Sequence, residues 1–514
     1  MQTRCLSCGE LLAGVAQLCE ACEARENAHV AIPQPAERPT PAPAESDTSE
    51  LVINLAFVAI ITSLVLGAAV WLIALGGAST LGLSGNGDGP EVVIATGTQT
   101  PVTSLVPLGY ETGDCEFAAP DGVTVECGYL TVPQDRAQPD FGRVRLPVAV
   151  FKSQSAERKA DPIVYLDGGP GGDTLEGIEF LYPALEPLAA NRDLIVFDQR
   201  GAGGSVPSLA CPEVTNINYD HILRQFSIDE RVAQDEASAR SCYNRLVESG
   251  IDPTLARSAE SAADVNDLRQ ALGYEQWNLY GVSYGTKLAL TVMRDFPEGV
   301  RSAVLDSVYP LQSDLYSEHQ AGFDRALGVL FESCASAPSC SSPYPELEQA
   351  FYDTVDRLNE IPVQFSIGSI TGRSRITATI DGVWFSAFVF SALYSEDLIA
   401  LLPKMIFDTR DHNYQLLKIV ADLHLQDIQS FSQGMYFSVQ CAEEAPFTDR
   451  EAVVAAAEAH PRLSEFSEYA ARSIFASCDE WQAPPAPASE NEPVNSPVPA
   501  LVLAGQFDPI TPPE

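Results

Sequence analysis

Ser283 lies at the centre of Gly281-Val282-Ser283-Tyr284-Gly285, a spacing that suits a nucleophilic serine. Residues 276–280 predict a short buried strand before it, and residues 286–294 predict a helix after it. A serine on such a sharp turn projects its hydroxyl above the sheet, and small residues two before and two after it are needed because the turn is tight. An ordinary surface turn is the alternative, but the flanking strand and helix favour catalysis.

Two loops upstream of Ser283 follow predicted buried strands. Residues 161–166 lead into the glycine-rich run Asp167-Gly168-Gly169-Pro170-Gly171-Gly172. Such a loop can direct backbone N–H groups at a developing oxyanion, although a plain tight turn has the same composition. Residues 194–197 lead into Asp198-Gln199-Arg200-Gly201, where we expect the Asp and the Arg to pair and hold the loops beneath the nucleophile.

The order of these motifs, followed by Gly505-Gln506-Phe507-Asp508-Pro509-Ile510-Thr511-Pro512, resembles the proline iminopeptidase and tripeptidyl aminopeptidase group of serine peptidases. The resemblance runs from about Cys115 to the end of the chain, and it includes residues 127–133 and 261–269. It implies an α/β-hydrolase fold, with a doubly wound sheet and a helical lid insertion. It also implies an exopeptidase that acts on free N-termini, and it leaves the substrate open.

The same resemblance implies particular catalytic roles. Ser283 would be the nucleophile, and the backbone N–H groups of Tyr284 and Gly169 would form the oxyanion hole. Asp508, which follows an apolar strand-like run at residues 500–504, would be the acid that orients a histidine. The family commonly has a histidine where this chain has Asp167, and we expect this departure to affect loop geometry or specificity.

The general base is the larger departure. In this fold the histidine follows the acid along the chain, but all six histidines precede Asp508. They are His29, His221, His319, His412, His424 and His460. A continuation of the protein beyond Glu514, an inactive enzyme and a lid histidine are three explanations. We favour the first, since the sequence stops at Glu514 directly after an intact acid motif and before the expected last strand and helix.

Residues 311–490 predict a lid inserted between two parts of the hydrolase core, residues 111–310 and 491–514. This segment alternates amphipathic helical stretches with aromatic-rich turns. The sheet needs only one helix for the crossover here, so the additional helical sequence is best interpreted as a lid. Glu443 and Glu444 are candidates to bind the ammonium group of a substrate, because a desolvated carboxylate pairs well with a cation. A solvated surface is the alternative for this pair.

The N-terminal residues 1–26 predict a small zinc-ribbon-like module. Cys5, Cys8, Cys19 and Cys22 form two Cys-x-x-Cys pairs, and four thiolates can bind a structural zinc ion tetrahedrally. The spacing between the pairs is shorter than usual, and disulfides are the alternative. No cofactor is expected for catalysis. Residues 27–50 predict a disordered linker because they are rich in Pro, Ala and Glu.

Residues 51–77 predict one transmembrane helix, because they are uncharged and long enough to cross the hydrocarbon core. Arg4, Arg25 and Arg38 precede this segment, whereas no Lys or Arg follows it until Arg136. The asymmetry predicts a cell-membrane protein with a cytoplasmic N-terminus and an extracytoplasmic hydrolase domain. Residues 78–110 would then form a stalk.

Eight cysteines follow the predicted span, and an oxidising compartment would allow them to form disulfides. Proximity and the resemblance suggest two pairs, Cys115–Cys127 and Cys334–Cys340, with Cys211–Cys242 and Cys441–Cys478 as weaker suggestions. Free buried cysteines are the alternative.

The formal net charge of -40 argues against nucleic acid as a partner. The sequence therefore predicts a membrane-anchored serine aminopeptidase that takes peptide substrates with a free N-terminus. Two alternatives remain: an esterase or other small-molecule hydrolase on the same fold, and a catalytically inactive sensor that binds a peptide.

Overall fold

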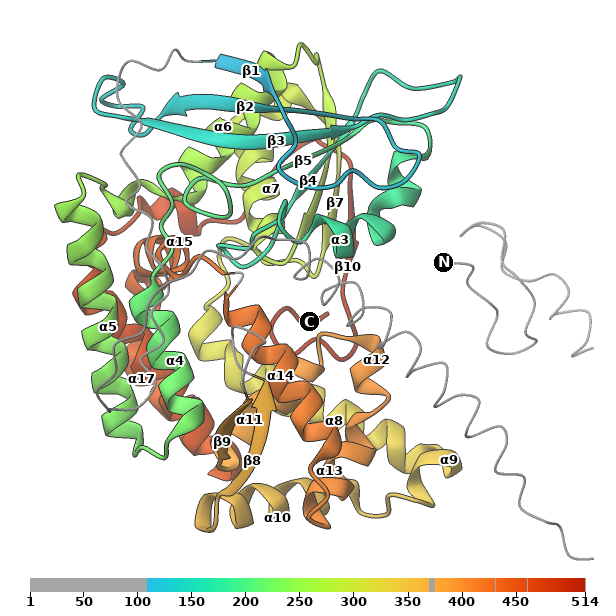
Figure 1. Cartoon of the computed structure of the whole chain (residues 1–514), viewed down its shortest axis with the longest axis vertical. Coiled ribbons are helices and arrows are strands. Elements are labelled where there is room, and N and C mark those ends of the chain that lie inside the picture. The colour runs from blue at the N-terminus through green and yellow to red at the C-terminus, as the bar shows by residue number, and fades with distance from the viewer. Residues whose placement is uncertain (1–108, 369–374, 430, 460, 514) are drawn as a thin grey trace, which may run out of the picture. The chain divides into compact units, whose positions relative to one another are not determined.

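The computed structural model describes residues 109–368, 375–429, 431–459 and 461–513 (Figure 1). Its centre is a sheet of eight strands in the order β1-β2-β3-β5-β4-β6-β7-β10. The first three strands are antiparallel, and β5, β4, β6, β7 and β10 run parallel to one another. The strands are β1 (Gly109–Gly113), β2 (Val125–Pro133), β3 (Arg143–Phe151), β4 (Ile163–Leu166), β5 (Leu194–Phe197), β6 (Trp277–Val282), β7 (Val300–Asp306) and β10 (Ala500–Leu503).

Both faces of the sheet are covered by helices, which explains the nearly continuous apolar sequences of β4 and β5. Successive side chains of a strand point to opposite faces. Val150 and Ile195 therefore share one core with the helices α6 (Ser258–Ala271) and α7 (Tyr284–Asp295). Phe151 and Val196, their direct neighbours in sequence, pack on the other face with α3 (Ile178–Leu185).

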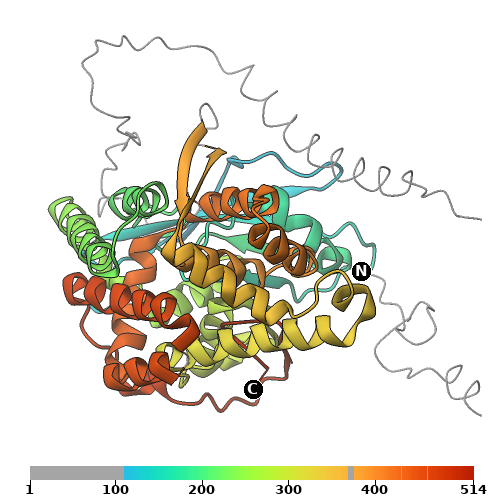
Figure 2. The ribbon, with the colours of Figure 1, turned by 90° about the horizontal axis from the view of Figure 1, so that it is seen from below.

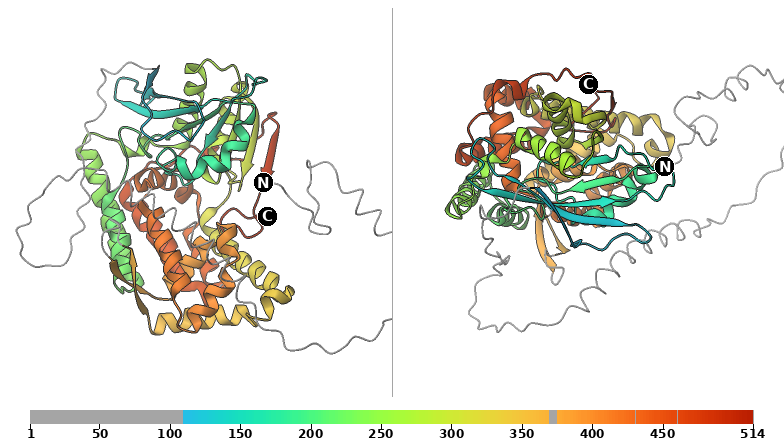
Figure 3. Two further views of the ribbon diagram at one scale, coloured as in Figure 1. Left: turned by 45° about the vertical axis from the view of Figure 1, so that its right-hand side comes forward. Right: turned by 90° about the horizontal axis from the view of Figure 1, so that it is seen from above.

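A long helical insertion lies between β7 and β10, in the part of the chain for which the sequence predicts a lid. It has its own core of aromatic and aliphatic side chains, and it includes a two-stranded hairpin. Figures 1 and 3 show the lid helices gathered at one end of the sheet, and Figure 2 shows them from below. Its elements are α8 (Leu315–Ser336), α9 (Pro338–Ser341), α10 (Leu347–Glu360), β8 (Val363–Gly368), β9 (Arg375–Ile380), α11 (Gly382–Ala392), α12 (Glu396–Ile399), α13 (Leu402–Arg410), α14 (Gln415–Gln429), α15 (Gln433–Val439), a π-helix at Gln440–Glu444, α16 (Arg450–Ala459) and α17 (Ser464–Trp481).

A helix pair that the sequence did not predict packs against this lid. It consists of α4 (Pro212–Leu223) and α5 (Ile228–Glu248), which lie between β5 and α6. Ser227 and Glu230 form a capping box that starts α5, because each side chain accepts a backbone N–H of the other. Figure 1 shows α5 running beside α17.

Four disulfides join the eight cysteines of the described chain. They are Cys115–Cys127, Cys211–Cys242, Cys334–Cys340 and Cys441–Cys478, the same pairs that the sequence suggested. The second disulfide links the start of α4 to α5, and the fourth links the π-helix to α17.

The predicted location in the cell membrane, with a cytoplasmic N-terminus and an extracytoplasmic hydrolase, must be withdrawn. No helix among the described residues is long and apolar enough to cross a bilayer. The two longest of them, α5 and α8, carry charged residues along their length. The predicted span at residues 51–77 lies outside the described residues.

The predicted zinc ligands Cys5, Cys8, Cys19 and Cys22 also lie outside the described residues, as do the linker and nearly all of the stalk. Within the described part of the chain, no group of three or more His, Cys, Asp or Glu side chains could hold a metal ion. Zinc binding therefore stays a prediction from sequence.

Candidate active site

Ser283 occupies the turn between β6 and α7 with φ 53° and ψ -121°. This left-handed backbone costs energy for a residue with a side chain, and it is the conformation of a nucleophile elbow. Two contacts hold the turn: the Ser283 N–H donates to the Asp306 carbonyl (3.0 Å), and the Thr286 N–H donates to the Ser283 carbonyl (2.8 Å). Residue 285 must be glycine, because a Cβ there would lie 1.9 Å from the Leu166 carbonyl oxygen.

The glycine-rich loop after β4 lies against Ser283. A Cβ on Gly168 would come within 3.3 Å of the Ser283 Cβ, and Gly169 lines the same cavity as Ser283. Asp167 organises this loop: its Oδ1 accepts the Gly168 N–H (2.9 Å), and its Oδ2 accepts the Thr174 hydroxyl (3.0 Å). The side chain at 167 thus acts on loop geometry, as expected from its departure from the family pattern.

Asp198 and Arg200 have structural roles, but with other partners than expected. Asp198 accepts the backbone N–H groups of Leu175 (2.9 Å) and Gly204 (2.8 Å), whereas Arg200 forms two bonds to Asp264 (2.7 and 2.6 Å). Burial raises the pKa of Asp198 to about 6. Burial and the nearby Asp198 carboxylate raise the pKa of Asp173 to about 7.

A buried polar network connects α7 to the lid behind the elbow. The Tyr284 hydroxyl is 3.0 Å from Ser258 Oγ, and both the backbone N–H and the hydroxyl of Ser258 donate to Glu443 (2.7 Å each). Lys287 forms an ion pair with Glu444, and its Nζ is 3.6 Å from Glu443. Burial lowers the pKa of Lys287, but the two facing carboxylates outweigh it and raise that pKa overall.

This network accounts for the environment of the two predicted ammonium ligands. Glu443 is held by Ser258 and Glu444 by Lys287, and all three charged groups are almost fully buried. Neither glutamate lines the cavity beside Ser283. An ammonium-binding role for them stays a prediction. The role of Lys287 was not predicted from the sequence, because a lysine in the first turn of a helix does not indicate that it will pair with a residue as distant in the chain as Glu444.

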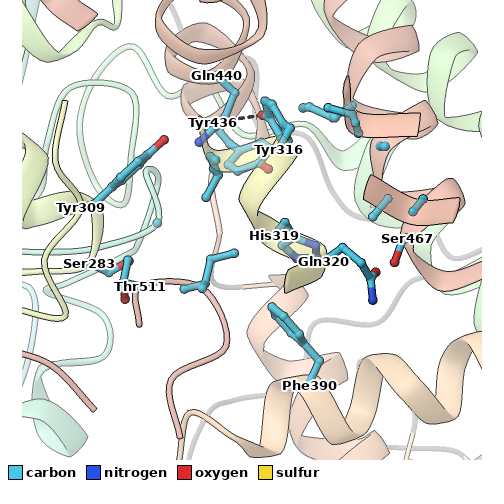
Figure 4. Close-up of a pocket in the computed structure, with 18 of the residues that line it drawn as sticks. Ser283, Tyr309, Tyr316, His319, Gln320, Phe390, Tyr436, Gln440, Ser467 and Thr511 are labelled. Carbon is cyan, nitrogen blue, oxygen red and sulfur yellow. Dashed lines mark hydrogen bonds between the residues drawn. The ribbon is translucent and has the colours of Figure 1, made fainter. Parts of the chain in front are cut away.

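A cavity of about 290 Å³ opens beside Ser283, between the core and the lid (Figure 4). Its wall contains aromatic and small aliphatic side chains, and none of the described residues that line it is an Asp, Glu, Lys or Arg. The lining residues are Gly169, Ser283, Tyr309, Leu315, Tyr316, His319, Gln320, Phe390, Tyr394, Tyr436, Gln440, Val453, Ala457, Ser467, Ala470, Ala471, Ile474, Ile510 and Thr511.

His319 is the histidine of the described chain that lines this cavity. Its ring packs 5.1 Å from that of Phe390 and 6.0 Å from that of Phe466. Burial lowers the pKa of His319 to about 4, so the imidazole is neutral at pH 7. His424 lies elsewhere in the lid against Trp384 and Phe388, and His412 is exposed beside Tyr414.

Asp508 lies in the turn after β10, whose next residues Ile510 and Thr511 line the cavity. Its Oδ1 accepts the N–H groups of Ile510 and Thr511 (2.9 Å each), and its Oδ2 accepts the Thr511 hydroxyl (2.7 Å). Within the described residues, no histidine hydrogen-bonds to Asp508 or to Ser283. The structure thus brings the predicted nucleophile and the loop of the predicted acid to one cavity.

The mostly parallel sheet, the elbow and the glycine loop define an α/β-hydrolase fold, and the chain is an enzyme of the serine hydrolase type. The family model "alpha/beta hydrolase fold" matches residues 161–346, and the model "TAP-like protein" matches residues 463–514. These two segments contain Ser283 and Asp508, respectively.

Three relatives make the comparison more specific. The chain is 26% identical over 416 residues to serine protease Hip1 of Mycobacterium tuberculosis (strain ATCC 25618 / H37Rv), which covers 75% of this chain and 76% of that protein. It is 32% identical over 221 residues to tripeptidyl aminopeptidase of Streptomyces lividans, covering 40% and 39%. It is 27% identical over 440 residues to carboxylesterase B of Mycobacterium tuberculosis (strain CDC 1551 / Oshkosh), covering 80% and 82%.

Proposed function

We propose that the protein is a serine peptidase that releases proline or short peptides from free N-termini, with Ser283 as the nucleophile. The observation that carries the proposal is the strained Ser283 turn. Ser283 lines a cavity that is also lined by Gly169 and by the loop that follows Asp508. The relatives named serine protease and tripeptidyl aminopeptidase support peptide substrates. The TAP-like match over residues 463–514 supports the assignment of Asp508 as the acid.

In this reaction the Ser283 oxygen forms a bond to the scissile carbonyl carbon, and the carbon–nitrogen bond then breaks. The proton of Ser283 passes to a general base, which returns it to the departing amine; a water molecule, deprotonated by the same base, then attacks the acyl carbon, and cleavage of the ester bond releases the N-terminal product and returns the proton to Ser283. The N–H groups of Tyr284 and Gly169 would stabilise the oxyanion. We infer that the triad histidine is a residue outside the described ones, since His319 packs against Phe390 and Phe466 and has no hydrogen bond to Asp508.

The test is labelling by a fluorophosphonate probe together with turnover of peptides that carry a chromogenic leaving group. Ser283→Ala should abolish both, and His319→Gln should preserve most of each. Ser307→Ala is the matched control, because Ser307 also has a positive φ (57°) but does not line the cavity. Undiminished turnover in Ser283→Ala would overturn the assignment of the nucleophile.

The requirement for a free N-terminus needs its own measurement, because no carboxylate lines the cavity. We expect a free tripeptide substrate to be cleaved at least tenfold faster than its N-acetylated form, since acetylation adds bulk at the end of the substrate that the aminopeptidase assignment requires to be free. Equal rates for the two substrates would contradict the aminopeptidase assignment and leave a serine peptidase without that specificity.

An esterase is the second candidate. It is favoured by the relative named carboxylesterase B and by a cavity wall that is aromatic and uncharged. The two candidate functions can be distinguished by measuring kcat/KM for an ester and for a peptide that share the same acyl group, and by comparing the two values. A peptidase should cleave both, whereas an esterase should leave the peptide intact.

A further inference from the structure

Gln320, on the lid helix α8, is a buried amide without a hydrogen-bonding partner. Its side chain is 3% exposed, and neither its Nε2 nor its Oε1 bonds to any atom of the described residues. A buried polar group left unpaired costs about 1–3 kcal/mol, so most such groups in folded proteins have partners. The position of Gln320 therefore requires an explanation.

Gln320 lines the cavity that contains Ser283, and several other polar side chains of the wall are already engaged, although the Tyr309 hydroxyl, like Gln320, has no hydrogen-bonding partner among the described residues. The Tyr316 hydroxyl donates to Gln440 Oε1 (2.6 Å), and the Thr511 hydroxyl donates to Asp508. The Ser467 hydroxyl donates to the Leu463 carbonyl (3.1 Å). Gln320 thus offers the cavity both a free donor and a free acceptor.

The chemistry of this pair selects the kind of group that it can bind. A side-chain amide donates one hydrogen bond and accepts another in one plane, which is the complement of a peptide group. A carboxylate could only accept from the amide Nε2, and an ammonium group could only donate to its Oε1, so either would leave one of the two amide groups unpaired. The absence of Asp, Glu, Lys and Arg from the residues lining this cavity agrees with an uncharged ligand group there.

We propose that Gln320 binds a non-scissile peptide group of the substrate, accepting its N–H and donating to its carbonyl oxygen. The scissile bond is excluded because Gln320 lies across the cavity from Ser283, as Figure 4 shows. The inference rests on the proposed peptidase function and deepens it: the substrate must carry at least one peptide bond besides the one that is cleaved. Gln320 is thereby a specificity-determining residue supplied by the lid.

The experiment measures binding rather than turnover, so that it does not depend on catalysis. Tetra-alanine is titrated calorimetrically into Ser283→Ala, together with three analogues in which lactate replaces alanine at position 2, 3 or 4. Each lactate replaces one peptide N–H by an ester oxygen. One of the three analogues should bind about tenfold more weakly, because Gln320 Oε1 then faces an oxygen instead of a donor.

The same titrations in the double variant Ser283→Ala/Gln320→Met should remove that difference, because methionine has a similar shape and no strong hydrogen-bonding group. Gln320→Leu is a second variant with the same loss. Both should keep or slightly raise the melting temperature, since they remove an unpaired buried amide. Gln349→Met is the matched control: Gln349 is exposed on α10 and bonds to Asp353.

A lactate effect of equal size with Gln, Met and Leu at position 320 would overturn the inference, and so would a failure of tetra-alanine to bind. Failure of the proposed function looks different. The wild-type protein would then bind tetra-alanine through Gln320 but release no product from it.

Discussion

Two buried polar regions of the molecule, one behind the Ser283 turn and one on the lid helix α8, differ in how their polar groups are satisfied. On the side of the nucleophile, Ser258, Lys287 and the paired glutamates form a closed set of hydrogen bonds and ion pairs. On α8 of the lid, Gln320 is equally buried and has no partner. In the proposed function, the first arrangement would hold the Ser283 turn in place before substrate arrives, and the second would leave hydrogen-bonding groups for the substrate.

The largest effect that this comparison predicts comes from opening the closed network. Lys287→Met should destabilise the protein by about 3–5 kcal/mol, because it leaves two glutamates buried against each other without a cation. Urea unfolding measures this loss. Lys404→Met on α13 is the control: Lys404 is exposed, Asp408 is partly buried, and their i,i+4 pair should contribute less than about 0.5 kcal/mol. Equal losses in the two variants would show that the buried network stabilises the protein no more than an ion pair at the surface does.

Two glycine substitutions compare how tightly the backbone is packed at the Ser283 turn and in the lid helix α8. Gly285→Ala should cost about 2 kcal/mol or more and reduce turnover, because its Cβ would overlap the Leu166 carbonyl oxygen. Gly328→Ala, within α8, should instead stabilise the protein by up to about 1 kcal/mol, because nothing lies within 4 Å of the added Cβ. Thermal unfolding compares the two. A destabilised Gly328→Ala would show that the lid is packed as tightly as the elbow.

The smallest effect concerns pH and the two carboxyl groups beneath the glycine loop. The pKa of Asp173 is raised to about 7 and that of Asp198 to about 6, so the folded protein binds protons that the unfolded chain has released. Stability should therefore fall as pH rises from about 4 to about 7. Asp173→Asn should flatten this dependence by a few degrees in melting temperature. Asp140→Asn, at an exposed position, should leave it unchanged.

The predictions from sequence succeeded where the necessary information is local. The elbow at Ser283 needs glycines two residues away, and the Cys334–Cys340 disulfide closes a loop of a few residues. The lid could be recognised from the surplus of helical sequence between two strands. These features are set by spacing along the chain.

Contacts between distant residues could not be predicted in the same way. Lys287 and Glu444 are 157 residues apart, and each by itself reads as an ordinary charged residue. The packing of α5 against α17 depends on two amphipathic helices from separate insertions. Gln320 follows the helical pattern of α8, and only the fold shows that its amide has no partner.

The ion pair between Lys287 and Glu444 has a consequence for how substrate enters. It joins the first turn of α7 to the π-helix of the lid, and both side chains are almost fully buried. A lid that opened as one rigid body would separate these charges at a cost of several kcal/mol. The Cys441–Cys478 disulfide further ties that segment to α17. We therefore expect the part of the lid around Glu444 to stay fixed to α7 while other lid elements move to admit substrate.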